Sequence, residues 1–161
     1  MFKTGFYPTS AAVLMVVLTG NAGADIQGRV IRVLDGDTIE VLQVTNERSR
    51  IRLDGIDAPE KKQAFGQRSR QFLNNQVGQQ VVVVTGDKTD RYGRILGTVW
   101  LEDLNVNAMQ VGNGMAWAYC YHGKASNSEY LRMEKEARKD KRGLWADPDP
   151  VEPWKWRMNY R

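Results

Sequence analysis

The feature that most limits the possible fold is a run of three short segments, residues 27–34, 38–44 and 49–53, in which apolar and polar side chains alternate. A period of two is typical of β-strands with one buried face. Asp-Gly-Asp at 35–37 separates the first two segments, and Thr-Asn-Glu at 45–47 separates the next two. Because such short turns join neighbouring antiparallel strands, we expect a three-stranded meander.

The remaining sequence predicts two more strands and about three helices. A valine-rich fourth strand at 80–85 is expected to be buried on both faces, and a fifth strand is expected at 95–101. Helical spacing and capping residues predict helices over 63–77, over 104–111, and from a cap at Ser126 or Asn127 to about residue 141. This order indicates a mainly β domain with helices (α+β), and the five-stranded OB-fold barrel is the leading candidate.

The first 24 residues differ in character from the rest. They contain one charged residue, Lys3, an unbroken apolar run at 11–18, and the small residues Ala22-Gly23-Ala24. This pattern is typical of a secretory signal peptide, cleaved here before Asp25. The apolar run is shorter than the roughly 20 residues that span a bilayer. We therefore expect an exported chain, periplasmic or extracellular, that is not bound to a membrane after cleavage.

Two further units follow the signal peptide: an expected barrel domain at 25–146 and a tail at 147–161. The tail begins as a proline-rich spacer and ends in an aromatic and basic segment, 154–161. Its tryptophans have two interpretations. They can pack on the barrel, as large aromatic side chains usually do, or they can form a stacking platform for nucleic-acid bases.

The composition excludes several kinds of site. One histidine and one cysteine argue against a zinc site, which normally takes several such ligands. A Ser-His-Asp triad would need His122, the one histidine of the chain. This residue precedes Gly123 in an expected surface loop, so we do not expect a triad. A net charge of +4 favours polyanionic partners such as nucleic acid.

Acidic and basic residues gather in three clusters, Asp-Gly-Asp-Thr at 35–38, residues 52–60 and residues 90–94. Asp37 and Asp57 are the predicted metal ligands, and carboxylates without histidine favour Ca²⁺ or Mg²⁺. The carbonyl of Ala58 is a further candidate ligand, because the following proline keeps the backbone extended. Taken alone, the aspartates of the first cluster could simply form a turn.

The other members of the clusters suit the chemistry of phosphodiester hydrolysis. Glu60 is the candidate general base, and Arg52 and Arg94 are candidate phosphate clamps, because a guanidinium group donates two parallel hydrogen bonds. Each residue also has an ordinary structural explanation. An acid such as Glu60 is favoured at a helix N-terminus, and the two arginines could simply be solvated. Together they supply charge neutralisation and water activation, the two main needs of this reaction.

The order of these motifs resembles the staphylococcal nuclease (thermonuclease) family. The resemblance extends over about residues 28–145 and rests on DGDT (35–38), RLDGIDAPE (52–60), TDRYGR (89–94), NGMAWAYCY (113–121) and GLW (143–145). It implies an OB-fold and a secreted, Ca²⁺-dependent, sugar-nonspecific endonuclease that acts on DNA and RNA and leaves 3′-phosphate ends. It also implies a monomer that prefers single-stranded or frayed substrates, and it places Ca²⁺ ahead of Mg²⁺.

The resemblance assigns roles residue by residue. Asp37 and Asp57 match the Ca²⁺ carboxylates, Asp35 matches an acid beside the metal, and Glu60 matches the base or water-orienting group. Arg52 and Arg94 match the catalytic arginines. The substrate-binding positions are Arg91, Tyr92, Tyr119 and Tyr121. This chain departs from the family pattern in the alanine at 58, a shorter segment at 60–67, and the tail.

Two other functions stay open from the sequence. A non-catalytic OB-fold could bind nucleic acid or peptides, although Asp37, Asp57 and Glu60 would repel a phosphate backbone unless a cation intervened. A secreted structural or adhesion module explains neither the acids nor the arginines. The preference between DNA and RNA, the choice of metal, the final compartment and the biological role are also left open.

Overall fold

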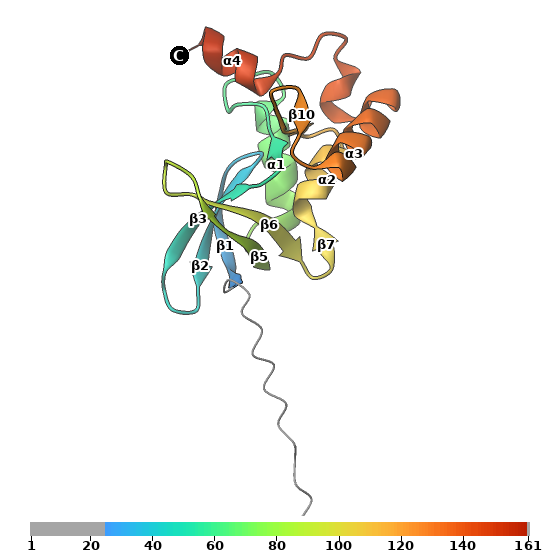
Figure 1. Cartoon of the computed structure of the whole chain (residues 1–161). Coiled ribbons are helices and arrows are strands. Elements are labelled where there is room, and N and C mark those ends of the chain that lie inside the picture. Colours follow the sequence, from blue (N-terminus) through green and yellow to red (C-terminus); the bar gives the residue numbers. More distant parts are fainter. Residues whose placement is uncertain (1–24, 161) are drawn as a thin grey trace, which may run out of the picture.

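The computed structural model describes residues 25–160, in which a β-barrel is covered at one end by helices (Figure 1). The expected signal peptide, residues 1–24, lies outside the described residues. Five strands form the barrel: β1 (Ile26–Asp35), β2 (Thr38–Gln43), β3 (Arg48–Leu53), β5 (Val81–Thr89) and β6 (Ile95–Leu101). They confirm the predicted OB-like, α+β architecture.

Strand pairing closes the barrel. β1 pairs antiparallel with β2 and β5, β2 with β3, and β5 with β6. β3 then pairs parallel with β6, with Arg52 opposite Leu96. This last pairing lays the end of the meander beside the start of β6. It therefore brings Arg52 near Arg94, which directly precedes β6.

Helices and short two-residue strands complete the fold. The helices are α1 (Gly66–Val77), α2 (Val106–Gly112), α3 (Ser128–Lys139), the 3₁₀ helix η1 (Gly143–Ala146) and α4 (Pro153–Asn159). The two-residue strands are β4 (Ile56–Asp57), β7 (Leu104–Asn105), β8 (Trp117–Ala118), β9 (Cys120–Tyr121) and β10 (Lys124–Ala125). The three predicted helices are present, and α3 is capped by the Asn127 side chain, which accepts from two backbone N–H groups.

The main core fills the barrel with apolar residues from the strands and from α1 and α2. In β5, Val82 and Val84 are buried whereas Val81 is 48% exposed. The prediction that this strand is buried on both faces is therefore wrong. Only the inner face of a small closed barrel is lined by its core, so even a continuous valine run alternates between inside and outside.

The turn between β1 and β2 touches α1 closely. A Cβ atom added at Gly36 would lie 1.8 Å from Oγ of Ser69 and 2.8 Å from Cβ of Ala58. Only glycine allows this approach. The contact fixes the turn that carries Asp37 against the segment that carries Asp57, so the packing of α1 helps to define the site.

The tail is ordered by a second apolar cluster, and α4 is a helix that the sequence did not predict. Trp117 and Trp145 lie in this cluster, and Trp154 of α4 packs against it with its ring 5.5 Å from that of Trp117. The packing interpretation is confirmed for Trp154. Trp156 instead stacks on Tyr160, at 4.0 Å between ring centroids. No helix within residues 25–160 has the length and apolar character needed to cross a bilayer.

Candidate active site

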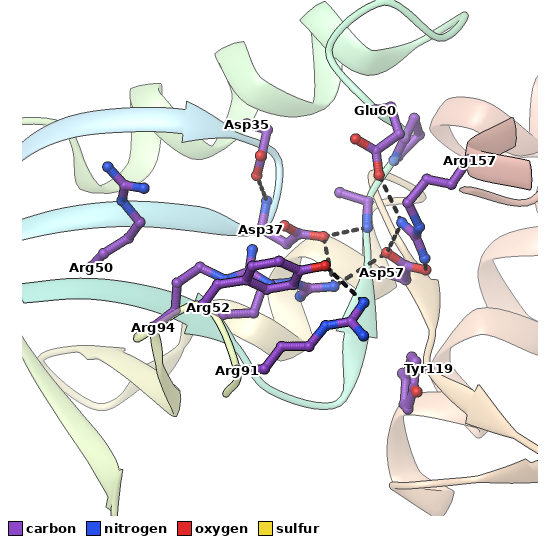
Figure 2. Close-up of a pocket in the computed structure, with 13 residues that line it drawn as sticks. Asp35, Asp37, Arg50, Arg52, Asp57, Glu60, Arg91, Arg94, Tyr119 and Arg157 are labelled. Atoms are coloured by element: carbon purple, nitrogen blue, oxygen red, sulfur yellow. Dashed lines mark hydrogen bonds and ion pairs between the residues drawn. The ribbon is translucent and has the colours of Figure 1, made fainter. Parts of the chain in front are cut away.

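The predicted site residues converge on one cavity of about 620 Å³ (Figure 2). Of the positions predicted from the sequence, all but Tyr121 line it. The lining residues are Asp35, Asp37, Arg50, Arg52, Asp57, Ala58, Pro59, Glu60, Arg91, Tyr92, Arg94, Tyr119 and Arg157. They come from the end of β1 and the turn after it, from β3, from β4 and the segment after it, from the β5–β6 loop, from the residue between β8 and β9, and from α4.

Asp37 and Asp57 face each other in the floor of the cavity and are almost fully buried, at 6% and 1% exposure. The backbone N–H of Ala58 donates to Oδ2 of Asp37 over 2.7 Å. Nη2 of Arg52 lies 3.1 Å from that oxygen and 3.2 Å from Oδ1 of Asp57. One guanidinium nitrogen therefore links the two predicted metal ligands.

Arg52 is held in a fixed orientation. Its Nη1 donates to the carbonyl oxygens of Leu53 and Ile56, over 2.8 and 2.9 Å. Burial acts to lower the pKa of this guanidinium, but the nearby charges of Asp37, Asp57 and Asp35 outweigh burial and raise it. Arg52 is therefore a permanent positive charge at the floor of the cavity.

The carboxylates crowd each other electrostatically. Burial, and then the negative charge of Asp37, raise the pKa of Asp35 to about 7. Burial also raises the pKa of Asp57, and hydrogen bonds from Arg157 only partly offset this. A divalent cation bound in the cavity would favour the ionised form of both carboxyl groups.

The residues present suit a hard divalent cation. Two buried carboxylates offer oxygen ligands, and neither histidine nor cysteine lines the cavity. Within residues 25–160, no group of three or more histidine, cysteine, aspartate or glutamate side chains is arranged to hold a metal ion. Ca²⁺ and Mg²⁺ routinely complete their coordination with backbone carbonyls and water, so a pair of carboxylates is compatible with binding either ion.

Arg94 is positioned by Asp90, a residue for which the sequence suggested no separate role. Oδ2 of Asp90 accepts from Nε of Arg94 over 2.8 Å, and Oδ1 accepts from the backbone N–H groups of Tyr92 and Arg94. Although burial opposes it, these hydrogen bonds lower the pKa of Asp90. The Asp-x-x-Gly spacing of this turn was the available signal, because aspartate there commonly binds the following backbone.

Aromatic residues form part of the rim of the cavity. Tyr92 is exposed, and the guanidinium groups of Arg91 and Arg94 lie 4.8 and 5.5 Å from the centre of its ring. Tyr119 also lines the cavity. Tyr121 does not, because it lies next to the turn of the β9–β10 hairpin and packs edge-on against His122, at 4.0 Å between ring centroids. Its substrate-binding role stays a prediction.

Arg157 is the functional candidate that the sequence did not reveal. It extends from α4 and donates to both carboxylate oxygens of Asp57, over 3.1 and 2.8 Å, and to Oε1 of Glu60 over 2.7 Å (Figure 2). The hydrogen bond to Asp57 is the main cause of its raised pKa. An arginine in an aromatic tail carries no local sign of partners about 100 residues away.

The sequence of this chain is similar to those of several known proteins. Residues 50–147 match the family model described as "Staphylococcal nuclease homologue". The chain is 51% identical to "Protein ParB" of Escherichia coli, covering 92% of this chain and 88% of that protein. It is 47% identical to a "Micrococcal nuclease" of Shigella flexneri, covering 91% and 89%. It is also 50% identical to an "Uncharacterized endonuclease" of Escherichia coli, covering 83% and 86%.

Proposed function

Since this chain belongs to the staphylococcal nuclease family, we propose that it is an exported, Ca²⁺-dependent, sugar-nonspecific endonuclease that leaves 3′-phosphate ends on DNA and RNA. That it is a nuclease, and so a phosphodiester hydrolase, follows from the family and from relatives named as nucleases. The observation that carries the finer proposal is the convergence of Asp37, Asp57 and Glu60 with Arg52 and Arg94 on one cavity.

The cation comes first in the proposed mechanism. Ca²⁺ held by Asp37 and Asp57, with Mg²⁺ as the second choice, would supply a positive charge that polarises the scissile phosphate. The support is the buried carboxylate pair and the raised pKa values of Asp35 and Asp57, whose main cause is burial. We assign Asp35 to the surroundings of the cation, because its Oδ1 accepts from the backbone N–H of Asp37. The carbonyl of Ala58 is the proposed backbone ligand.

The protein's own groups then carry out the hydrolysis. Arg52 and Arg94 bind the non-bridging phosphate oxygens and neutralise the charge that develops on them. Glu60 accepts a proton from water as the water oxygen bonds to phosphorus. The bond from phosphorus to the 5′ oxygen breaks, and that oxygen leaves as a hydroxyl after taking a proton from solvent. The phosphate stays on the 3′ oxygen.

The rim of the cavity suits unpaired bases. Tyr92 and Tyr119 present aromatic faces, and Arg91 adds a positive charge beside them. Because every base has a face that stacks on an aromatic ring, such a rim favours single-stranded or frayed nucleic acid without strong sequence preference. We propose a monomer, since one chain supplies all the residues invoked here.

The test is to incubate the mature protein, residues 25–161, with plasmid DNA and with RNA, and to measure cleavage in the presence of Ca²⁺ and in the presence of EDTA. We expect Ca²⁺-dependent cleavage of both, and products that a DNA polymerase extends only after phosphatase treatment. Glu60→Gln should lower kcat on the order of 10²-fold or more, with substrate affinity largely kept. Equal cleavage in EDTA would refute the metal proposal, and an equal loss of affinity in Glu60→Gln would refute the base.

Export has its own test. The chain expressed with residues 1–24 should be recovered from the periplasm or the medium with Asp25 as its N-terminal residue. Amino-terminal sequencing of the recovered protein checks this expectation. Retention of the intact chain in the cytoplasm would contradict it.

A further inference from the structure

The C-terminal helix α4 brings a further arginine to the site, and the mechanism above does not use it. Arg157 donates from Nη1 to Oδ1 and from Nη2 to Oδ2 of Asp57, which is the bidentate arrangement that guanidinium and carboxylate groups favour. Nη1 also donates to Glu60. Arg157 therefore binds both a proposed ligand of the cation and the proposed base.

The acceptor positions of Asp57 are nearly filled by arginines. A carboxylate offers about four acceptor positions on its two oxygens. Oδ1 accepts from both Arg52 and Arg157, and Oδ2 accepts from Arg157. Metal coordination by Asp57 would therefore use an oxygen that Arg157 already contacts. It would also place a divalent cation beside a guanidinium group, and the two repel each other.

Of the two arginines that bind Asp57, Arg157 is the one that a cation can displace. Arg52 also donates to two backbone carbonyl oxygens. It belongs to the barrel strand β3, and its side chain is 15% exposed. Arg157 lies near the end of a seven-residue helix, and its side chain is 37% exposed. The opposite end of that helix is anchored by buried Pro153 and by Trp154 against Trp117. The part that carries Arg157 can therefore move while α4 stays attached.

We propose that Arg157 competes with the divalent cation for Asp57, so that α4 weakens metal binding and metal binding loosens α4. The inference rests on the proposed function, because it takes Asp57 as a ligand of the cation. The two effects must be equal in size, since the coupling between two binding events is reciprocal. The tail helix α4, which lies outside the matched residues 50–147, would thereby set the metal concentration at which this enzyme becomes active.

The first test is the affinity of Ca²⁺ for the mature chain, measured by isothermal titration calorimetry. Arg157→Gln keeps a hydrogen-bonding side chain but removes the charge, and we expect it to bind Ca²⁺ roughly fivefold more tightly or better. Arg157→Lys restores the charge and should return the affinity toward wild type. The matched control is Arg132→Gln, which removes an exposed arginine paired with Glu136 on α3. It should leave the affinity unchanged.

Each outcome of the calorimetry supports or overturns the proposed competition for Asp57. Equal affinity in wild type and Arg157→Gln overturns the competition, while the proposed nuclease stands. Weaker affinity in Arg157→Gln also overturns it, because Arg157 would then hold Asp57 in place for the metal. Failure of the wild-type chain to bind Ca²⁺ or Mg²⁺ would remove the proposed metal site itself, and this inference with it.

The reciprocal effect has a readout that does not depend on activity. Hydrogen exchange measured by mass spectrometry should show faster exchange at 153–159 in wild type when Ca²⁺ is added. In Arg157→Gln, exchange there should already be fast and should not change with Ca²⁺. Slower exchange of this segment in wild type on adding Ca²⁺ would overturn the proposal.

Discussion

At the scale of single residues, the site depends on arginines whose orientation other groups fix. Arg52 is held by two backbone carbonyl oxygens, and Arg94 is held through Nε by Asp90. The protein therefore positions each guanidinium group, and the substrate does not have to order it. Fixed donors of this kind stabilise developing charge better than mobile ones, because no reorganisation is needed during the reaction.

Arg94→Lys tests this directly. Lysine keeps the positive charge but cannot bind Asp90 and a phosphate oxygen through one planar group. We expect kcat to fall on the order of 10²-fold, the usual cost of losing one such donor. Steady-state kinetics on DNA would measure it, with Arg132→Lys on α3 as the control. A lysine variant with the wild-type rate would contradict the clamp role.

At the scale of elements, α2 connects the barrel closure to the site through one buried amide. Asn107 is fully buried, and its Oδ1 accepts from the backbone N–H of Val99 in β6. Its Nδ2 donates to the carbonyl oxygens of Asp54 and Gly97. The side chain thus satisfies backbone groups of β6 and of the segment between β3 and β4, which positions Asp57.

Asn107→Ala should therefore destabilise the fold. Three backbone groups would lose a hydrogen bond, and only the carbonyl of Gly97 would keep a second one, from the backbone N–H of Asp54. Leaving buried polar groups unsatisfied costs about 3 kcal/mol in the free energy of unfolding. Urea unfolding followed by circular dichroism measures the change. Asn75→Ala, an exposed asparagine on α1, should shift stability by less than about 0.5 kcal/mol. A loss at Asn107 no larger than the control's would contradict this role.

The other element-scale question concerns the outer face of α4. Trp156 and Tyr160 stack on each other and line a second cavity together with Glu60, Lys61, Lys62 and Arg157. Aromatic rings beside lysines suit the bases and phosphates of a nucleic-acid strand that extends out of the active site. The stacking interpretation of the tail thus concerns this pair, whereas Trp154 serves packing.

Replacing either aromatic residue by alanine tests that interpretation. Trp156→Ala or Tyr160→Ala should raise KM for single-stranded DNA about fivefold or more, because stacking a base contributes about 1–3 kcal/mol. kcat should change little. Met158→Ala, an exposed residue of the same helix that does not line the cavity, is the control. An unchanged KM in both variants would assign the pair to the structure of the tail alone.

At the scale of the whole molecule, cation binding and stability should be linked. A ligand that binds only the folded chain stabilises it by about 2.7 kcal/mol when present at 100 times its dissociation constant. We expect Ca²⁺ to raise Tm by several degrees relative to EDTA in differential scanning calorimetry. Asp37→Asn combined with Asp57→Asn should abolish the shift. A shift that survived in the double variant would place the cation elsewhere.

Much of this architecture could be predicted because its signals are local. The alternation of residues 27–53 predicted the meander, and its tight turns placed Asp35 and Asp37 at one strand end. The spacing of 52–60 predicted that Asp57 and Glu60 follow the third strand closely. Periodicity and turn chemistry act over a few residues, so they can be recognised without knowing what the rest of the chain does.

The tertiary structure alone decided the contacts between distant segments. The parallel pairing of β3 with β6 turned an open meander into a barrel and set Arg52 near Arg94. The one-sided burial of β5 followed from that closure. The packing of Trp154 on Trp117 delivered Arg157 to Asp57 and Glu60. Such contacts join residues up to 100 positions apart and depend on the shapes of assembled surfaces, for which a linear sequence carries no repeating pattern.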